Sequence, residues 1–183
     1  HDDTPGFERE FVVRNIAFYN DELYLINSDG SKTKVDAPNS ASKSVYREWL
    51  SLELREPYTV NGKTYAAGSL IATKFDDFMK GGRKFDVLFE PSDTTSLAGF
   101  SPTKTHFILN VLDNVKNRLY VLTHSDKGWS REPLKGAPAF GTVSASGVDP
   151  EDSDDYFLTV TDYVTPTTLM IGTIGKAPET LKQ

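Results

Sequence analysis

The chain contains no cysteine among its 183 residues. Disulfide frameworks, thiolate zinc sites and cysteine nucleophiles are therefore excluded. The absence of cysteine does not select a compartment, because cytoplasmic and periplasmic proteins alike can do without it. Localisation stays open between these two.

Long apolar runs and basic clusters are also missing. No apolar stretch approaches the roughly 18–20 residues that a membrane span needs, so no membrane partner is expected. The net charge is −6, and the most basic stretch is the short segment 80–84, KGGRK. Nucleic acid binding requires a basic surface, so a nucleic acid partner is not expected either.

What the chain does have is alternation of apolar and polar residues with a period of two. Leu50, Leu52 and Leu54 alternate through residues 49–55, a pattern typical of a strand. Hairpin turns are predicted at three sites rich in Asn, Asp and Gly. Only residues 75–80 favour a helix, and they supply about one and a half turns. The turn sites are residues 28–31, 60–63 and 125–128.

Two stretches of the chain resemble each other. Residues 96–123 and 143–172 share an order of short strands, with Pro102 and Pro150 separated by 48 residues and Phe107 and Phe157 by 50. A period near fifty carried by short strands is typical of β-propeller blades. Because one blade cannot bury both of its faces alone, such units are expected to stack.

Grouping the strands by this repeat predicts an all-β fold of about four β-propeller blades of antiparallel strands. The first unit lacks an opening strand, which suggests a cut from a longer chain. Each of the last two units is predicted to have four strands. The expected blades are 8–37 (incomplete), 41–92, 94–138 and 139–181. Strands are expected at 11–18, 22–27 and 32–35 in the first unit, and at 95–100, 105–113, 117–123 and 129–133 in the third.

Several segments resemble the propeller domain of bacterial prolyl oligopeptidase family serine peptidases, and its later blades in particular. The similarity extends over nearly the whole chain from about Phe11, and the motifs are structural. The segments are 46–50 (YREWL), 68–78 (GSLIATKFDDF), 85–91 (FDVLFEP), 96–102 (SLAGFSP), 156–169 (YFLTVTDYVTPTTL) and 177–182 (APETLK).

This resemblance implies a two-part enzyme. An α/β-hydrolase domain would carry a Ser-Asp-His triad, and a seven-bladed propeller would limit entry to short peptides that are cut after proline. The chain would be part of that propeller, and the catalytic domain would follow residue 183 and be absent here. The implied partners are that hydrolase domain and peptide substrates, and no cofactor is implied.

No catalytic, cofactor-binding or metal-binding residue is predicted in the chain itself. A Gly-x-Ser-x-Gly nucleophile elbow is missing, and segment 141–147 (GTVSASG), which has the wrong spacing, is expected to be a strand. His106 should open a strand and His124 should end one, while His1 is terminal. The acidic run 149–155 lacks the glycine and glutamate that a calcium-binding EF-hand loop requires.

The aromatic residues are expected to pack between blades rather than bind a ligand. The role of Trp129, which follows a Lys-Gly turn, is left open. The rings expected to face inward are Phe85, Phe89, Phe107, Tyr120 and Phe157.

Two functions from different classes remain after this search. The favoured one is a non-catalytic propeller segment that gates a serine peptidase, and the alternative is a free-standing β-propeller module that binds proteins. An enzyme acting within these residues has no supporting pattern. Because open blade faces are apolar, the isolated chain is expected to form a homodimer through them or to close its own ring.

Overall fold

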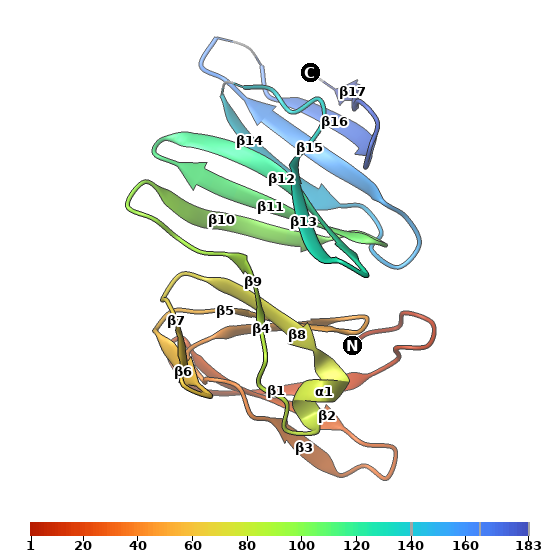
Figure 1. Ribbon diagram of the computed structural model, residues 1–183. Helices are drawn as coiled ribbons and strands as arrows, with labels where there is room; N and C mark the ends of the chain where they lie inside the picture. The colour runs from red at the N-terminus through yellow and green to blue at the C-terminus, as the bar shows by residue number, and fades with distance from the viewer. Residues whose placement is uncertain (140, 165, 183) are drawn as a thin grey trace. The chain divides into compact units, whose positions relative to one another are not determined.

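The structure is a computed structural model that describes residues 1–139, 141–164 and 166–182. It is built almost entirely of antiparallel strands, as predicted, and it divides into two compact units, residues 1–91 and 92–183 (Figure 1). Each unit contains two principal sheets. No helix in the described ranges is long and apolar enough to cross a membrane.

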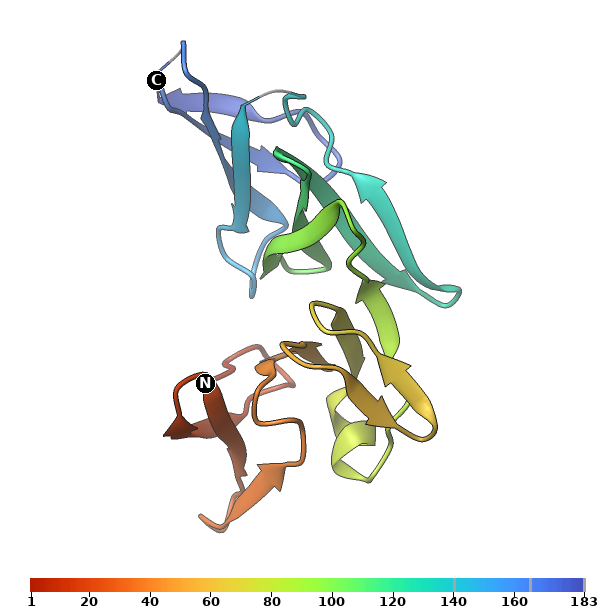
Figure 2. The ribbon, with the colours of Figure 1, turned by 90° about the vertical axis from the view of Figure 1, so that its left-hand side faces the viewer.

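Unit 1 pairs a three-stranded sheet with a four-stranded one (Figures 1 and 2). The first sheet has the order β1-β2-β3 and the second the order β4-β5-β8-β9. Along the chain, a separate hairpin precedes the third strand of the second sheet, and one helical turn follows that strand. The elements are β1 (Glu10–Ala17), β2 (Asn20–Ile26), β3 (Lys32–Val35), β4 (Ser42–Tyr46), β5 (Trp49–Glu53), β6 (Tyr58–Val60), β7 (Lys63–Tyr65), β8 (Leu70–Lys74), α1 (Phe75–Met79) and β9 (Asp86–Phe89).

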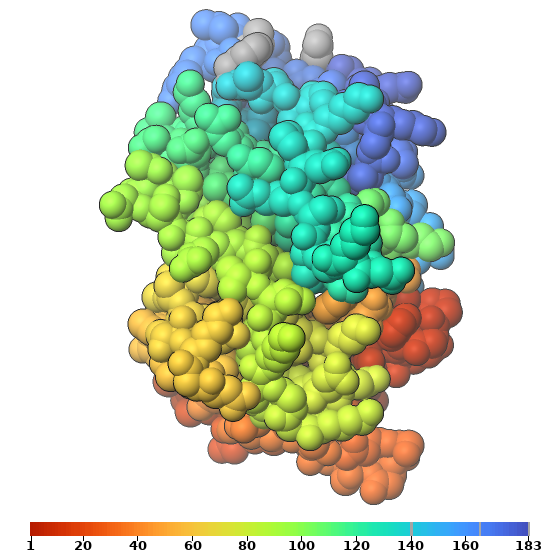
Figure 3. All heavy atoms as spheres, in the orientation of Figure 1, coloured from red at the N-terminus to blue at the C-terminus, as the bar shows by residue number. Residues whose placement is uncertain are grey.

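The core of unit 1 includes residues from both of its sheets. Leu50, Leu52 and Leu54 all belong to it, which confirms the face predicted from their alternation. The five-residue helix α1 is too short to be stable alone and is held by the burial of Phe75 and Phe78. The hairpin β6–β7 packs through its tyrosines and forms a continuous part of the surface of unit 1 (Figure 3).

A buried lysine joins the two sheets of unit 1. The side chain of Lys43, on β4, is only 2% exposed. Its Nζ donates to Asp21 Oδ1 at 2.6 Å, to the Asp21 carbonyl at 3.1 Å and to the Ala41 carbonyl at 2.9 Å. An ammonium group has three donors, so all of them have acceptors. The charge is therefore paired and hydrogen-bonded, as burial requires.

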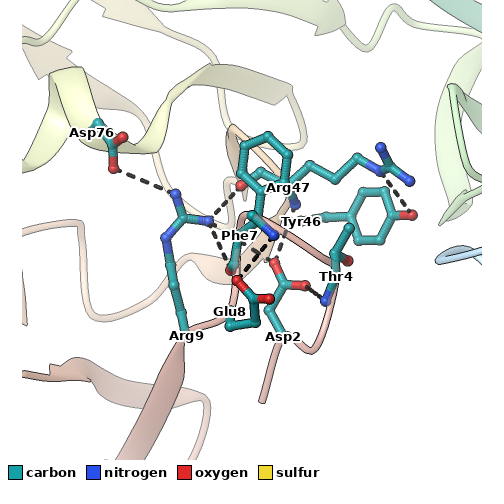
Figure 4. Close-up of polar contacts among 9 residues, drawn as sticks. Asp2, Thr4, Phe7, Glu8, Arg9, Tyr46, Arg47 and Asp76 are labelled. Carbon is teal, nitrogen blue, oxygen red and sulfur yellow. Dashed lines mark hydrogen bonds and ion pairs between the residues drawn. The ribbon is translucent and has the colours of Figure 1, made fainter. Parts of the chain in front are cut away.

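The segment before β1 is tied to the β4–β5 turn (Figure 4). Asp2 and Arg9 form an isolated antiparallel bridge, and the Asp2 carboxylate accepts the backbone N–H of Arg47 at 3.2 Å. The Arg9 guanidinium donates to the Arg47 carbonyl at 2.6 Å, lies 4.8 Å from the Phe75 ring centroid and pairs with Asp76 at 3.4 Å. Arg47 has a φ of +51°, so these contacts hold both of its peptide groups in a conformation that costs energy.

Unit 2 contains two four-stranded sheets, as the repeat predicted. Their orders are β10-β11-β12-β13 and β14-β15-β16-β17. All four strands expected between residues 95 and 133 are confirmed. The elements are β10 (Thr95–Pro102), β11 (His106–Asp113), β12 (Lys116–Ser125), β13 (Gly128–Pro133), β14 (Thr142–Gly147), β15 (Asp155–Thr161), β16 (Thr168–Thr173) and β17 (Glu179–Lys182).

Apolar side chains of both sheets form the core of unit 2. Ile108 and Val121 belong to it from the first sheet, and Val143, Tyr156 and Leu158 from the second. Tyr156 is fully buried, and burial raises the pKa of its hydroxyl. Its ring fits because residue 172 is glycine: a Cβ there would lie 2.6 Å from the Tyr156 hydroxyl oxygen.

The predicted repeat is present, but its alignment was wrong by one residue at Phe157 and by three residues at Pro150. In the first sheet Pro102 pairs with Phe107, and in the second Gly147 pairs with Tyr156. Tyr156, not Phe157, therefore corresponds to Phe107. Phe157 lies on the opposite face of β15 and is only half-buried.

Burial of the other aromatic residues tests the remaining predictions. Phe85, Phe89 and Phe107 are buried as expected, whereas Tyr120 is half-buried on the same face of β12 as the buried Leu122. Leu119 and Val121 are buried on the opposite face of that strand. Apolar residues on both faces of a strand make the period of two ambiguous about which face is buried.

The predicted hairpin turns are confirmed by backbone geometry. Asn61 and Gly62 have φ values of +49° and +73°, and Gly30 and Gly128 have +81° and +96°. Such left-handed conformations favour glycine and asparagine, which explains these residues at the turns. The helix predicted near residues 75–80 is likewise confirmed as α1.

Candidate functional site

Strand β14, the first strand of the second sheet of unit 2, packs on the first sheet and contacts β10, β11 and β12. Near one end, the Gly147 N–H donates to Ser101 Oγ at 3.0 Å. Toward the other end, Asn110 Nδ2 donates to the Val143 carbonyl at 3.1 Å, and Asn110 is the cross-strand partner of Gly99. Strand β14 is therefore bonded to β10 at its C-terminal end and to β11 near its N-terminal end, so it crosses the first sheet.

Small side chains occupy the exposed positions of these two strands. Alternate residues of a strand point to opposite sides, so Val143 is buried while its neighbours in β14 are exposed. No large side chain is among the exposed residues, and most carry a hydroxyl group. The exposed residues are Ser96 and Ala98 on β10 and Thr142, Ser144 and Ser146 on β14.

A glycine allows the close approach of the two strands. A Cβ built on Gly147 would overlap the carbonyl oxygen of Pro102, which is backbone and cannot rotate away. The φ of Gly147 is not positive, so the requirement for glycine is one of space rather than backbone conformation. The identity of residue 147 therefore sets how closely β10 and β14 approach.

A single carboxylate joins the loops beyond these strands. Asp154 Oδ1 accepts the Thr103 hydroxyl at 2.8 Å and the Thr105 N–H at 2.7 Å, and Asp154 Oδ2 accepts the Thr105 hydroxyl at 2.7 Å. The Lys104 N–H donates to the Ser153 carbonyl at 2.9 Å. The β10–β11 and β14–β15 loops are therefore bonded directly to each other.

The same contacts determine the ionisation of Asp154. Partial burial acts to raise its pKa, but the hydrogen bonds from the two threonines outweigh burial, with a smaller contribution from His106. The pKa of Asp154 therefore lies below its usual range. A depressed pKa means that Asp154 stabilises the fold above the pKa of the unfolded chain, near 4, and that this contribution is lost as the pH falls through the folded value.

Replacing Asp154 by asparagine is expected to lower the free energy of unfolding by about 1–2 kcal/mol near pH 7, because charge-assisted hydrogen bonds are lost. Urea denaturation should show a smaller difference from the parent chain near pH 3, where the parent carboxylate is becoming protonated. The control is Asp152→Asn in the same loop, an exposed residue whose change should have little effect. A difference that is independent of pH would contradict this role for Asp154.

The three histidines and the serine-containing segment 141–147, considered above as catalytic candidates, can each be located in the structure. His106 begins β11, as predicted, and its Nδ1 lies 2.8 Å from Thr123 Oγ1. His124 is exposed near the end of β12, and the exposed His1 pairs with Asp3. Segment 141–147 is mainly strand β14, as expected. The prediction that no residue of the chain is catalytic stays a prediction.

The acidic run 149–155 forms most of the β14–β15 loop and ends on the first residue of β15. Asp149 Oδ1 accepts the backbone N–H groups of Glu151 and Asp152, and Asp155 accepts the Thr173 hydroxyl. These carboxylates therefore shape and anchor the loop. Within the ranges that the structure describes, no group of three or more His, Cys, Asp or Glu side chains could hold a metal ion.

The side chain of Trp129, whose role was left open, is half-buried in unit 2. Its ring stacks on Phe107 at 5.5 Å between centroids and meets His124 edge-on at 5.0 Å. This is a packing environment rather than an exposed stacking platform.

Curated relatives of the chain are peptidases. An uncharacterized peptidase of Rickettsia prowazekii is 21% identical over 168 residues, which are 88% of this chain and 23% of the relative. An uncharacterized peptidase of Sinorhizobium fredii is 28% identical over 163 residues, 85% of this chain and 22% of the relative. The chain thus spans about a quarter of the length of these relatives. No family model matches it.

Solved structures also match nearly the whole of this chain to a part of a larger protein. A post-proline cleaving enzyme from Rickettsia typhi matches with a TM-score of 0.83 and 21% identity, over 96% of this chain and 26% of that enzyme. A prolyl endopeptidase structure matches with a TM-score of 0.68 and 16% identity, over 94% of this chain and 24% of that one. The predicted resemblance is confirmed, and the chain has the fold of part of a post-proline cleaving enzyme.

Proposed function

We propose that the chain is a non-catalytic propeller segment of a prolyl oligopeptidase-like serine endopeptidase. It limits access of short proline-containing peptides to an active site on a hydrolase domain outside this chain. The principal sheets are the blades of a partial propeller from a seven-bladed parent, with boundaries near 8–37, 41–92, 94–138 and 139–181.

The observation that carries this proposal is the packing of β14 on the face of the β10-β11-β12-β13 sheet. In a propeller the sheets are arranged radially around a central channel, so one edge strand of each sheet borders the channel. Successive blades pack face to face, so a first strand that packs on the preceding sheet fits this arrangement. Ser96, an exposed residue of β10, is small and would leave a channel open for a peptide.

The outer face of the β14–β17 sheet supports the arrangement. Phe157 corresponds to Ile108, which is buried in the unit 2 core. Phe157 pairs with Ile171, and Leu169 lies on the same face of the next strand, yet all three are only half-buried. An apolar face of this kind suits a further blade of the parent, and in the isolated chain it is where a homodimer would form.

The proposal is tested in the full-length polypeptide with Ser96→Trp, which places a large ring at an exposed position of the first strand β10, on the proposed channel wall. We expect kcat/KM for a peptide of about ten residues to fall at least tenfold, and that for a minimal chromogenic proline substrate to change less than about twofold. The control is Ser130→Trp, at an exposed position of the last strand β13, which should leave both values unchanged.

The isolated chain should release nothing above background from the chromogenic substrate. Robust turnover by the isolated chain, or an equal effect of both tryptophans on the long peptide, would contradict the proposal. An encoding gene with a stop codon after residue 183 would instead favour the free-standing interaction module.

A further inference from the structure

We propose that a cavity in unit 2 binds the C-terminal end of a short peptide whose last residue is proline. The cavity has a volume of about 200 Å³ and lies between β12 and the segment that follows β13, residues 134–139. The need for a free carboxylate and an apolar last residue follows from the side chains that line the cavity. The link to a reaction product rests on the proposed function, because cleavage after proline leaves such an end.

The apolar wall of this cavity is held in place by the turn after β13. Leu134 is buried in the unit 2 core, and its N–H donates to the Leu119 carbonyl at 2.9 Å. At Gly136, which has a φ of +80°, the chain leaves the line of β13, and Pro138 then lines the cavity. A Cβ on Gly136 would lie 2.5 Å from Pro178 Cδ, so the turn is packed against the segment before β17. The wall is therefore formed before a ligand binds, which lowers the cost of binding.

The edge of β12 beside the cavity has one unused backbone position. Lys116 pairs with Asp113 next to the two-residue β11–β12 turn, so the backbone groups of Lys116 and Arg118 point to β11. Those of Asn117 and Leu119 point to the opposite edge, where the Leu119 carbonyl is bonded to the segment after β13. Among the described residues, no backbone group bonds to the N–H or carbonyl of Asn117 on that edge. Because Asn117 lines the cavity, an extended peptide can exchange both bonds with it there.

Two cationic side chains line the same cavity. Lys116 and Arg118 are both exposed, and because they lie two residues apart they share a face of β12. Arg118 Nε donates to Asp113 Oδ2 at 2.8 Å, which leaves the Nη donors of the guanidinium for another group. Lys116 forms no ion pair with any residue that the structure describes. Asp113 offsets only one of the two positive charges, so the site favours an anion such as a peptide carboxylate.

The same backbone geometry favours proline as the last residue. The residue before it exchanges both backbone bonds with Asn117, so the nitrogen of the last residue points the other way, toward the apolar wall that includes Pro138. Proline suits that place because its nitrogen carries no hydrogen and leaves no donor unbonded. In either strand direction the last residue lies beside Lys116 or Arg118, which places its carboxylate near their charges.

The test measures binding of acetyl-Ala-Ala-Pro with a free carboxylate to the chain, by NMR chemical-shift changes of backbone amides. We expect a Kd of about 1 mM, because one anchored residue supplies limited affinity. The shift changes should centre on residues 116–120 and 133–139. At about ten times the Kd, the Asn117 amide should exchange at least fivefold more slowly. The amides of Lys116 and Arg118, which point to β11, are internal references and should change much less.

Peptides of the same length control for the two features of the ligand. The same peptide with a C-terminal amide lacks the carboxylate, and acetyl-Asp-Ala-Pro amide carries a carboxylate on a side chain instead. Both should bind at least tenfold more weakly than the free acid. Acetyl-Ala-Ala-Ala with a free carboxylate should bind at least threefold more weakly, because its last N–H is left unbonded. Equal binding of the alanine and proline acids would overturn the assignment of proline.

Lys116→Gln is expected to weaken binding of the proline acid at least fivefold. The matched control is Lys127→Gln, which removes the same charge from an exposed turn at the opposite end of β12 and should weaken binding less than twofold. Equal weakening by the two glutamines, or equal affinity for the free acid and the amide, would overturn the inference. The readout is equilibrium binding to this chain alone and does not depend on the Ser96→Trp kinetics, so the two proposals fail separately.

Discussion

Replacing Gly147 by alanine is expected to cost about 3 kcal/mol of the free energy of unfolding of unit 2. The added Cβ would overlap the Pro102 carbonyl oxygen, and the positions of both atoms are fixed by backbone that the sheets hold in place. Relief requires β10 and β14 to move apart. That movement would strain the Gly147–Ser101 hydrogen bond, 3.0 Å in length, at the same site.

Fluorescence of Trp129 provides a readout for unit 2 alone. The chain has two tryptophans, Trp49 in unit 1 and Trp129 in unit 2. Urea unfolding is therefore measured in a Trp49→Phe background. The control is Gly99→Ala on β10, where φ is also not positive and the nearest atom to an added Cβ is 3.8 Å away. Its effect should lie within about 0.5 kcal/mol. Equal effects of the two alanines would show that close approach at Gly147 is unimportant.

Replacing Lys43 by methionine is expected to destabilise unit 1 by about 3 kcal/mol. The long apolar stem is retained, but the Asp21 carboxylate and the carbonyls of Asp21 and Ala41 lose their shared donor. Removing one partner of a buried ion pair commonly costs 3–5 kcal/mol. The expected loss lies at the lower end because the Asp21 side chain is 38% exposed and water can solvate it.

Lys34→Met is the matched comparison on the neighbouring strand β3. Lys34 Nζ lies 2.8 Å from Glu22 Oε1, so the two ion pairs are similar in length, but its side chain is 39% exposed. Water screens exposed ion pairs, so Lys34→Met should cost much less stability than Lys43→Met. Trp49 fluorescence in a Trp129→Phe background reports unit 1. If both methionine variants lose the same stability, the loss at Lys43 does not come from burial of its charge.

The strands and turns could be predicted because their signals are local. Asn61 and Gly62 identify a hairpin, and Leu50, Leu52 and Leu54 identify a buried face, without knowledge of the rest of the chain. Phe157 shows the limit of this approach. Tyr156 and Phe157 are both large aromatic residues, and only the pairing of Tyr156 with Gly147 shows which of them faces the core.

The contacts of the candidate site depend on residues that are distant in sequence. Asp154 drew attention as part of an acidic run, yet its partners Thr103 and Thr105 lie about fifty residues earlier. Nothing in segment 141–147 indicates that the last glycine faces a carbonyl of another strand. The bridge between Asp2 and Arg9 was missed as well, because a single rung has no periodic signal.

The bonds along β10 and β14 have a mechanical consequence for unit 2. They comprise hydrogen bonds through Ser101, Asn110 and Asp154 together with the contact at Gly147, and none can lengthen far without breaking. We therefore expect the two sheets to keep a constant separation at their first strands. Thermal motion would change the separation more at the last strands, β13 and β17. A pore bordered by these first strands would keep a constant diameter while the outer strands of the sheets move.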